Sequence, residues 1–232
     1  MIETLLPTCV AAVEAWGDVT DAPLFPEEEF VIRAALAARR AEFTTARACA
    51  RRALRQLGVP DQAIPAGAAG EPCWPTGCLG SITHCHGYRA SAVARLEDIT
   101  ALGIDAEPDL PLPRGVLARI ALPVELRRVN EQQDGFSTSN WDRLLFCAKE
   151  AALKAWFPLT GRRLAFKRIS VTVDALTHRL TALPMEPQVP PRSAPPALSG
   201  AWLAARGLIT AAFTLPPRIE ATASEQRPPG SG

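Results

Sequence analysis

The sequence predicts an α+β fold made of two similar halves in succession. The main observation is that a helical pattern followed by a set of short strands occurs twice along the chain. Proline-rich residues 108–114 separate the two sets and are typical of a linker. With 232 residues, of which 47% are hydrophobic, the chain can bury a substantial core in one large domain or two small ones. We therefore expect an N-terminal half at 1–112, a C-terminal half at 113–216 and a tail at 217–232.

The first half is predicted to contain one long helix over residues 27–57. Pro26 is favourable at a helix start, and the three glutamates that follow it suit the positive end of the helix dipole. The Gly-Val-Pro sequence at 58–60 ends the pattern. Residues 1–26 are interrupted by prolines and carry no predicted element, and residues 60–80 are rich in Gly and Pro and predict a loop.

Short apolar or β-branched runs bounded by turn residues predict the strands. In the first half these runs lie at 80–84, 91–96 and 100–105, and in the second half at 169–173, 179–182, 201–203 and 208–213. Helices are expected near 115–130 and at 141–157, a proline-rich loop at 184–196, and disorder in the tail because it is rich in Pro, Gly and Ser.

Composition excludes several function classes. The chain has 25 basic and 24 acidic residues, so no general nucleic-acid or membrane surface is expected. No apolar run approaches the length of a membrane span, and the first residues lack the basic region of a signal peptide. The six cysteines form no CxxC pair, which predicts reduced thiols in a cytoplasmic protein.

The clearest chemical signal is the pair of carboxylates at Asp105 and Glu107. They end an apolar strand, and because side chains alternate along a strand they point to the same side. Two oxygen ligands at a strand end suit Mg²⁺, which usually also binds water and substrate phosphate. An isolated pair of this kind is more often a solvated strand end, so the interpretation depends on the helix at 141–157.

That helix adds a third carboxylate, Glu150, and two lysines, Lys149 and Lys154. Glu150 and Lys154 are four residues apart and share a helix face, which alone indicates an exposed ion pair. Large apolar residues border the same face, however, and this pattern is more typical of a site wall. Lys154 could then hold a phosphate oxygen while Glu150 binds metal or takes a proton.

His84 and the arginines of the long helix are further candidates for phosphate contact. His84 follows a strand beside a Gly-rich loop, although a lone histidine is more often structural; the spacing of the histidines makes zinc unlikely. Arg40, Arg47 and Arg51 fall on one helix face. This face predicts either a solvated basic surface or a guanidinium cluster for a phosphomonoester, and spacing does not decide between them.

Taken together, these segments resemble the Sfp-type 4′-phosphopantetheinyl transferases, and most closely the actinobacterial and enterobactin-type branch. The matching motifs lie in the expected order at 38–43 with Arg47, 70–75, 80–85, 103–108 and 141–157, so the resemblance spans roughly residues 25 to 215. One departure is the loop at 64–69, which lacks the basic residue that the family often carries there.

The resemblance implies a pseudo-twofold monomer of two α+β halves with coenzyme A in the cleft between them. It implies Mg²⁺, for which Mn²⁺ can substitute, on Asp105, Glu107 and Glu150. It implies that the same three acids and Lys154 are catalytic. The residues implied to contact coenzyme A are Arg39, Arg40, Arg47, Glu71, Pro72, Thr83, His84, Asp105, Lys149 and Lys154.

The implied activity is transfer of the 4′-phosphopantetheine arm of coenzyme A to a serine of apo acyl or peptidyl carrier proteins. These would serve polyketide, nonribosomal-peptide, siderophore or fatty-acid synthesis. The alternative is a non-catalytic protein of the same fold that binds coenzyme A or a carrier. The segment 114–128, with Leu117, Ile120, Leu122 and Leu126, is either a carrier-docking surface or an ordinary amphipathic helix.

Overall fold

The protein is described from a computed structural model that places residues 1–19, 22–133, 140–185 and 197–217. The predicted tail and most of the predicted proline-rich loop lie outside these residues. The helices are α1 (Pro26–Ile32), α2 (Ala37–Gln56), α3 (Val116–Ile120), α4 (Pro123–Gln133) and α5 (Trp141–Thr160), with short 3₁₀ helices η1 (Ile2–Leu5) and η2 (Phe166–Arg168). The strands are β1 (Ala11–Trp16), β2 (Cys78–Cys85), β3 (Tyr88–Arg95), β4 (Ala101–Pro108), β5 (Ile169–Asp174), β6 (Arg179–Pro184), β7 (Leu198–Ala205) and β8 (Leu208–Leu215).

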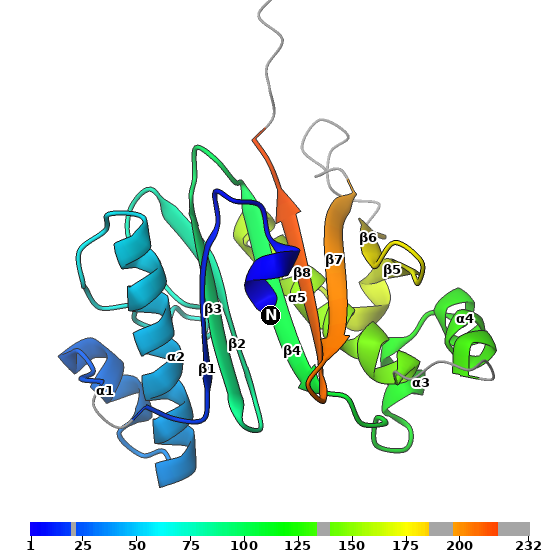
Figure 1. The fold of residues 1–232 in the computed structure, drawn as a ribbon, viewed down its shortest axis with the longest axis horizontal. Coiled ribbons are helices and arrows are strands. Elements are labelled where there is room, and N and C mark those ends of the chain that lie inside the picture. The colour runs from blue at the N-terminus through cyan, green and yellow to red at the C-terminus, as the bar shows by residue number, and fades with distance from the viewer. Residues whose placement is uncertain (20–21, 134–139, 186–196, 218–232) are drawn as a thin grey trace, which may run out of the picture.

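The strands form two antiparallel sheets that lie side by side (Figure 1). The smaller sheet has the order β1-β3-β2, and the larger has the order β4-β8-β7-β6-β5. In each half a strand comes first, then helices ending in a 20-residue helix, and then the remaining strands. The predicted α+β architecture of two similar halves is confirmed.

The N-terminal half differs from its prediction in two ways. The expected helix over 27–57 is two helices, because the chain turns between Ile32 and Ala37 and Leu36 is extended. The cause is the buried carboxylate of Glu28, which accepts two hydrogen bonds from Arg51. In one straight helix these residues would lie about 35 Å apart, so α1 must fold back beside α2. In addition, β1 was not predicted.

Helix α2 covers one face of the smaller sheet and α5 covers one face of the larger sheet. The contact of α5 with β4 is unusually close at Gly103, where an added Cβ would overlap backbone atoms of Ala151 and Ala155. On the opposite face of β4, Leu102, Ile104 and Ala106 are buried in an apolar cluster with residues of η1 and β3. The alternation of β4 therefore directs Asp105 and Glu107 toward the side of α5.

The two sheets are joined at β2 and β4 by side-chain hydroxyls. The Ser81 hydroxyl accepts a hydrogen bond from the Ile104 amide, and the Thr83 hydroxyl accepts one from the Ala106 amide, both at 3.0 Å. Strand β4 pairs with β8 in the larger sheet, so the predicted boundary at residue 112 does not coincide with the edge between the sheets. No helix among the described residues is long and apolar enough to cross a membrane.

Candidate active site

A cavity of about 560 Å³ opens between the two halves. One side comes from α2, the loop before β2 and β2 itself; the other comes from α5 and the segment that follows it. A volume of this size is typical of small-molecule sites. Among its lining residues are the cations Arg39, Arg47, His84, Lys154 and Arg163, where His84 counts only when protonated, and the acids Glu71 and Glu150.

Arg47 is the most buried arginine of this cavity, with 5% of its surface exposed. Its guanidinium lies 4.3 Å from the centre of the Phe43 ring and 3.9 Å from a Glu28 oxygen. Burial, opposed in part by Glu28, lowers the pKa of Arg47 to about 10, so the group stays cationic at neutral pH. Its Nε has no hydrogen-bond partner among the described residues, and a buried cation with a free donor favours an anionic ligand.

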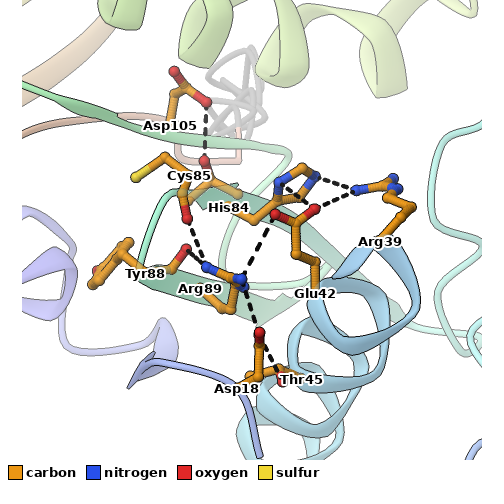
Figure 2. Close-up of polar contacts among 10 residues, drawn as sticks. Asp18, Arg39, Glu42, Thr45, His84, Cys85, Tyr88, Arg89 and Asp105 are labelled. Carbon is orange, nitrogen blue, oxygen red and sulfur yellow. Dashed lines mark hydrogen bonds and ion pairs between the residues drawn. The ribbon is translucent and has the colours of Figure 1, made fainter. Parts of the chain in front are cut away.

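His84 and Arg39 lie together on the same wall, with 2.8 Å between His84 Nε2 and an Arg39 nitrogen (Figure 2). Glu42 lies beside both of them, at 3.4 Å from Arg39 and 3.8 Å from His84 Nδ1. Burial first, and then the positive charge of Arg39, lowers the pKa of His84. Both effects favour the neutral imidazole in the free protein.

Asp105 is the centre of the acidic part of the site. Its Oδ1 accepts hydrogen bonds from Lys154 Nζ at 2.7 Å and from the Thr83 hydroxyl at 3.0 Å. Burial disfavours the Lys154 ammonium, but the nearby negative groups, Asp105 first and then Glu150, together outweigh this effect and raise the pKa of Lys154. Lys154 is thus paired with Asp105, which contradicts the alternative of a simple exposed pair with Glu150.

The other two acids lie near Asp105, and their negative charges are only partly compensated by nearby cations. Burial and the negative charge of Asp105 raise the pKa of Glu150, and the same two causes raise the pKa of Glu107. Glu107 is partly neutralised by Arg143, whose Nη1 lies 2.8 Å from its Oε2. Three carboxylates of which two have raised pKa values are costly to hold together without a cation.

The residues present fit a divalent cation. Asp105 Oδ2 is buried and has no hydrogen-bond partner among the described residues, so it remains available as a ligand. The donor set of three carboxylates suits Mg²⁺ or Mn²⁺. Within the described ranges, however, no three acid, histidine or cysteine side chains are already gathered in a metal-binding arrangement. The assignment of Asp105, Glu107 and Glu150 as ligands therefore stays a prediction.

The structure does not bring Lys149 to the cavity. Its ammonium is fully buried, 2.8 Å from a Glu125 oxygen, and donates to the carbonyls of Phe166 and Ile169. The expected contact of Lys149 with a diphosphate is corrected: this lysine ties α5 to α4 and to the start of β5. Burial lowers its pKa, although Glu125 opposes the shift.

Two other predicted contacts also lie elsewhere. Arg40 forms an exposed ion pair with Glu29 and is not among the cavity residues. The Thr83 hydroxyl is buried between β2 and β4 and is engaged by Asp105 and the Ala106 amide. Thr83 therefore positions an acid instead of touching a ligand. Glu71 and Pro72 do line the cavity, as expected.

Sequence reasoning missed two basic residues. Arg163 lines the cavity from the segment after α5, opposite the predicted arginines of α2. Arg143 pairs with Glu107 and also donates to the carbonyls of Leu110 and Pro111. Arg143 lies about two helical turns before Glu150 on the same face of α5, and this spacing was the available signal. No sequence signal marked Arg163.

Three of the four apolar residues suggested for carrier docking are buried or pack against the core. Ile120 is buried, and Leu117 and Leu126 pack against the apolar cluster between α5 and the larger sheet. Leu122 is half-buried. The structure therefore favours a packing role for these side chains, although the segment forms two helices, α3 and α4, instead of one.

Comparison with known proteins agrees with this geometry. Residues 26–94 match the model of the 4′-phosphopantetheinyl transferase N-terminal domain, and residues 101–190 match that of the 4′-phosphopantetheinyl transferase superfamily. The 4′-phosphopantetheinyl transferase Svp of Streptomyces mobaraensis is 42% identical, over all of this chain and 95% of its own length.

Two further relatives carry the same name. PptT of Mycobacterium tuberculosis is 42% identical over 93% of this chain and 98% of its own length. Npt of Nocardia iowensis is 47% identical over 75% of this chain and 77% of its own length. The two matched family models also divide between them the two halves that enclose the cavity. The chain belongs to the 4′-phosphopantetheinyl transferase family.

Proposed function

We propose that the protein transfers the 4′-phosphopantetheine arm of coenzyme A to a serine of apo carrier proteins, using the cavity between its halves. The observation that carries the proposal is the opposition of cations and acids there. Arg39, Arg47 and Lys154 line a cavity that Glu150 also lines. Asp105 Oδ1 lies 2.7 Å from the ammonium nitrogen of Lys154. Such a site suits a substrate with several phosphates and a reaction that moves a phosphoryl group.

The basic residues divide according to their place. Arg39 and Arg47, both on α2, are assigned to the 3′-phosphate of the adenosine, because planar guanidinium groups bind phosphate in a bidentate manner. Lys154 and His84 are assigned to the diphosphate. Glu71 and Pro72 are assigned to the border of the adenine, and Arg163 adds a cation on the α5 side of the cavity.

Asp105, Glu107 and Glu150 would hold Mg²⁺ or Mn²⁺. When bound, the ion would supply positive charge that stabilises the negative charge developing on the diphosphate during transfer. In the free protein Lys154 and Arg143 lie against two of these acids. Once the carboxylates bind the ion, Lys154 would be free to contact the diphosphate. Arg143 would keep its hydrogen bonds to the carbonyls of Leu110 and Pro111.

The protein groups then carry the proton and orient the reactants. Glu150, directly or through a water, removes the proton from the serine hydroxyl while the serine oxygen forms a bond to the phosphorus of the arm. The bond from that phosphorus to the leaving adenosine 3′,5′-bisphosphate breaks, and Lys154 offsets the negative charge on the leaving group. Catalysis is mainly positioning and electrostatic stabilisation.

The carrier should be acidic near its serine, because the residues that line the cavity include more cations than acids. Carriers of polyketide, nonribosomal-peptide, siderophore or fatty-acid synthesis are the candidate partners. We further propose a monomer that acts in the cytoplasm, where reducing conditions keep thiols free; all six cysteines are unpaired.

Intact-mass spectrometry of a panel of apo-carriers incubated with the protein, coenzyme A and Mg²⁺ tests the function. Addition of one phosphopantetheine group per carrier is expected, and none is expected with a chelator or with Asp105→Asn. Calorimetry with coenzyme A alone separates the rival function. Tight binding of coenzyme A without modification of any carrier would indicate a non-catalytic protein.

A further inference from the structure

A polar network lies behind the wall that carries Arg39 and His84 (Figure 2). It begins at Arg89 on β3, of which 5% is exposed. The Arg89 guanidinium donates to the carbonyls of Cys85 at 2.6 Å and Tyr88 at 3.2 Å. Both carbonyls flank the tight turn between β2 and β3, so these backbone hydrogen bonds fix the orientation of the Arg89 side chain.

Arg89 also contacts two acids, Asp18 and Glu42. Its Nη2 lies 2.9 Å from Asp18 Oδ1 and 3.6 Å from Glu42 Oε1. Asp18 in turn accepts from the Thr45 hydroxyl on α2. Glu42 is therefore held by one oxygen on the buried side, and its other oxygen faces Arg39 and His84 on the cavity side.

The contact between Arg39 and His84 determines where the imidazole proton lies. An arginine guanidinium can only donate, so His84 Nε2 must accept and cannot carry a proton. The proton of the neutral ring is then on Nδ1, which faces Glu42 Oε2 at 3.8 Å. Glu42 thus favours one tautomer of His84 and one position of Arg39 at the same time.

The charge of Glu42 is unfavourable for the assigned ligand. A carboxylate beside phosphate-binding groups repels the phosphate, and simple electrostatics predicts that its removal would strengthen coenzyme A binding. Its place between a buried arginine and two cavity side chains suggests a different role, which is to hold both side chains in one orientation.

We propose that Glu42 is a positioning residue, which transmits the fixed position of Arg89 to Arg39 and His84 on the phosphate-binding wall. The proposal rests on the proposed function for the identity of the ligand. It predicts the sign opposite to that of electrostatics: removal of Glu42 weakens the binding of coenzyme A.

Steady-state kinetics of Glu42→Gln and Glu42→Ala test the proposal. Glu42→Ala should raise the KM for coenzyme A about tenfold, the effect of losing one hydrogen bond to a charged group, and change kcat much less. Glu42→Gln, which keeps an acceptor but not the charge, should lie between Glu42→Ala and the wild type. The matched control is Asp61→Asn, which makes the same acid-to-amide change in an exposed ion pair. Asp61 lies after the end of α2 and pairs with Arg55 of that helix, so the KM of this variant for coenzyme A should not change. A lower or unchanged KM in Glu42→Ala would overturn the proposal.

Nuclear magnetic resonance of the imidazole nitrogens gives a readout independent of turnover. The chain has three histidines, so the His84 signals can be assigned with one His84→Gln variant. The wild type should show the Nδ1-protonated tautomer at neutral pH, and Glu42→Gln should show a mixture or the other tautomer. An Nε2-protonated ring in the wild type, or the same tautomer in both proteins, would overturn the proposal even if the wild type modified no carrier.

Discussion

Among single residues, Glu150 has a position that favours function over stability. Its pKa lies above the ordinary value of 4.5 because of burial and the charge of Asp105. The folded protein therefore binds the Glu150 proton more tightly than the unfolded chain does. The stabilising effect is complete below about pH 4.5 and is lost as the pH rises through the raised pKa of the folded state, so at neutral pH ionised Glu150 destabilises the metal-free protein.

Glu150→Gln should consequently lower kcat and raise stability together. Loss of the base and of one metal ligand should reduce kcat by about 100-fold or more. In the absence of metal the variant should melt at a higher temperature than the wild type at pH 7, and the difference should shrink toward pH 4. Thermal melts across this pH range check the sign. A variant that is less stable at pH 7 without metal would contradict the assigned cause of the shift.

Arg47 should distinguish coenzyme A from its analogue without the 3′-phosphate. Arg47→Ala removes a buried guanidinium and should raise the KM for coenzyme A by the equivalent of about 1.5–3 kcal/mol, with much less effect on dephospho-coenzyme A. Arg40→Ala is the comparison, because Arg40 points to Glu29 outside the cavity and its loss should leave both KM values unchanged. Equal effects of Arg47→Ala on both substrates would remove it from the 3′-phosphate site.

The residue types of the site were predictable, but the directions of some side chains were not. Glu150 and Lys154 differ by about 40° around the helix, and both line the cavity as expected. Lys149 and Lys154 differ by about 140°, so both could not face one ligand, and geometry alone already argued against Lys149. The partner of Lys149 is Glu125, 24 positions earlier in the chain, and such a long-range pair has no local sequence signal.

At the level of elements, local pattern identified most helices and strands and failed where tertiary contacts decide. The break between α1 and α2 contains no Gly or Pro and is imposed by the buried pair of Glu28 with Arg51. Strand β1 is rich in alanine and lacks the alternation typical of a strand. Its stability comes from pairing with β3 and from Glu14, which accepts hydrogen bonds from the chain's amino terminus and from Tyr88.

Gly103 should be essential for the placement of α5 on β4. A methyl group there would overlap the carbonyl oxygen of Ala151 and the amide nitrogen of Ala155, so the helix must move away. Gly103→Ala should destabilise the protein by about 1–3 kcal/mol, as overpacking does, and lower kcat because Glu150 and Lys154 move with the helix. Chemical denaturation and kinetics measure the two effects.

A matched glycine separates this explanation from a general effect of added volume. Gly200 lies in β7, where a Cβ would also overlap backbone and the Phe213 ring. Gly200→Ala should therefore be destabilising as well, but its kcat should be preserved in the folded fraction because α5 is not displaced. Normal kcat in folded Gly103→Ala would contradict the proposed link between this contact and the site.

Across the whole molecule, the site depends on how the two halves meet. The cations of α2 belong to one half and the acids of β4 and α5 to the other, and the order of elements alone does not give the contact between them. The sheets adjoin at β2 and β4, where the Ser81 and Thr83 hydroxyls replace a regular strand ladder. Only Thr83 also donates to an acid of the site, Asp105.

This difference gives a prediction about the joint between the halves. Thr83→Val and Ser81→Ala each leave a buried β4 amide without its acceptor, so each should destabilise the protein by about 1–3 kcal/mol. Thr83→Val should in addition lower kcat, because Asp105 loses the donor that fixes its Oδ1 and is left to Lys154 alone. Ser81→Ala, which frees no carboxylate, should keep kcat. If denaturation shows equal losses of stability and kinetics shows equal losses of kcat, the Thr83 hydroxyl acts only as a joint between the sheets and does not position Asp105.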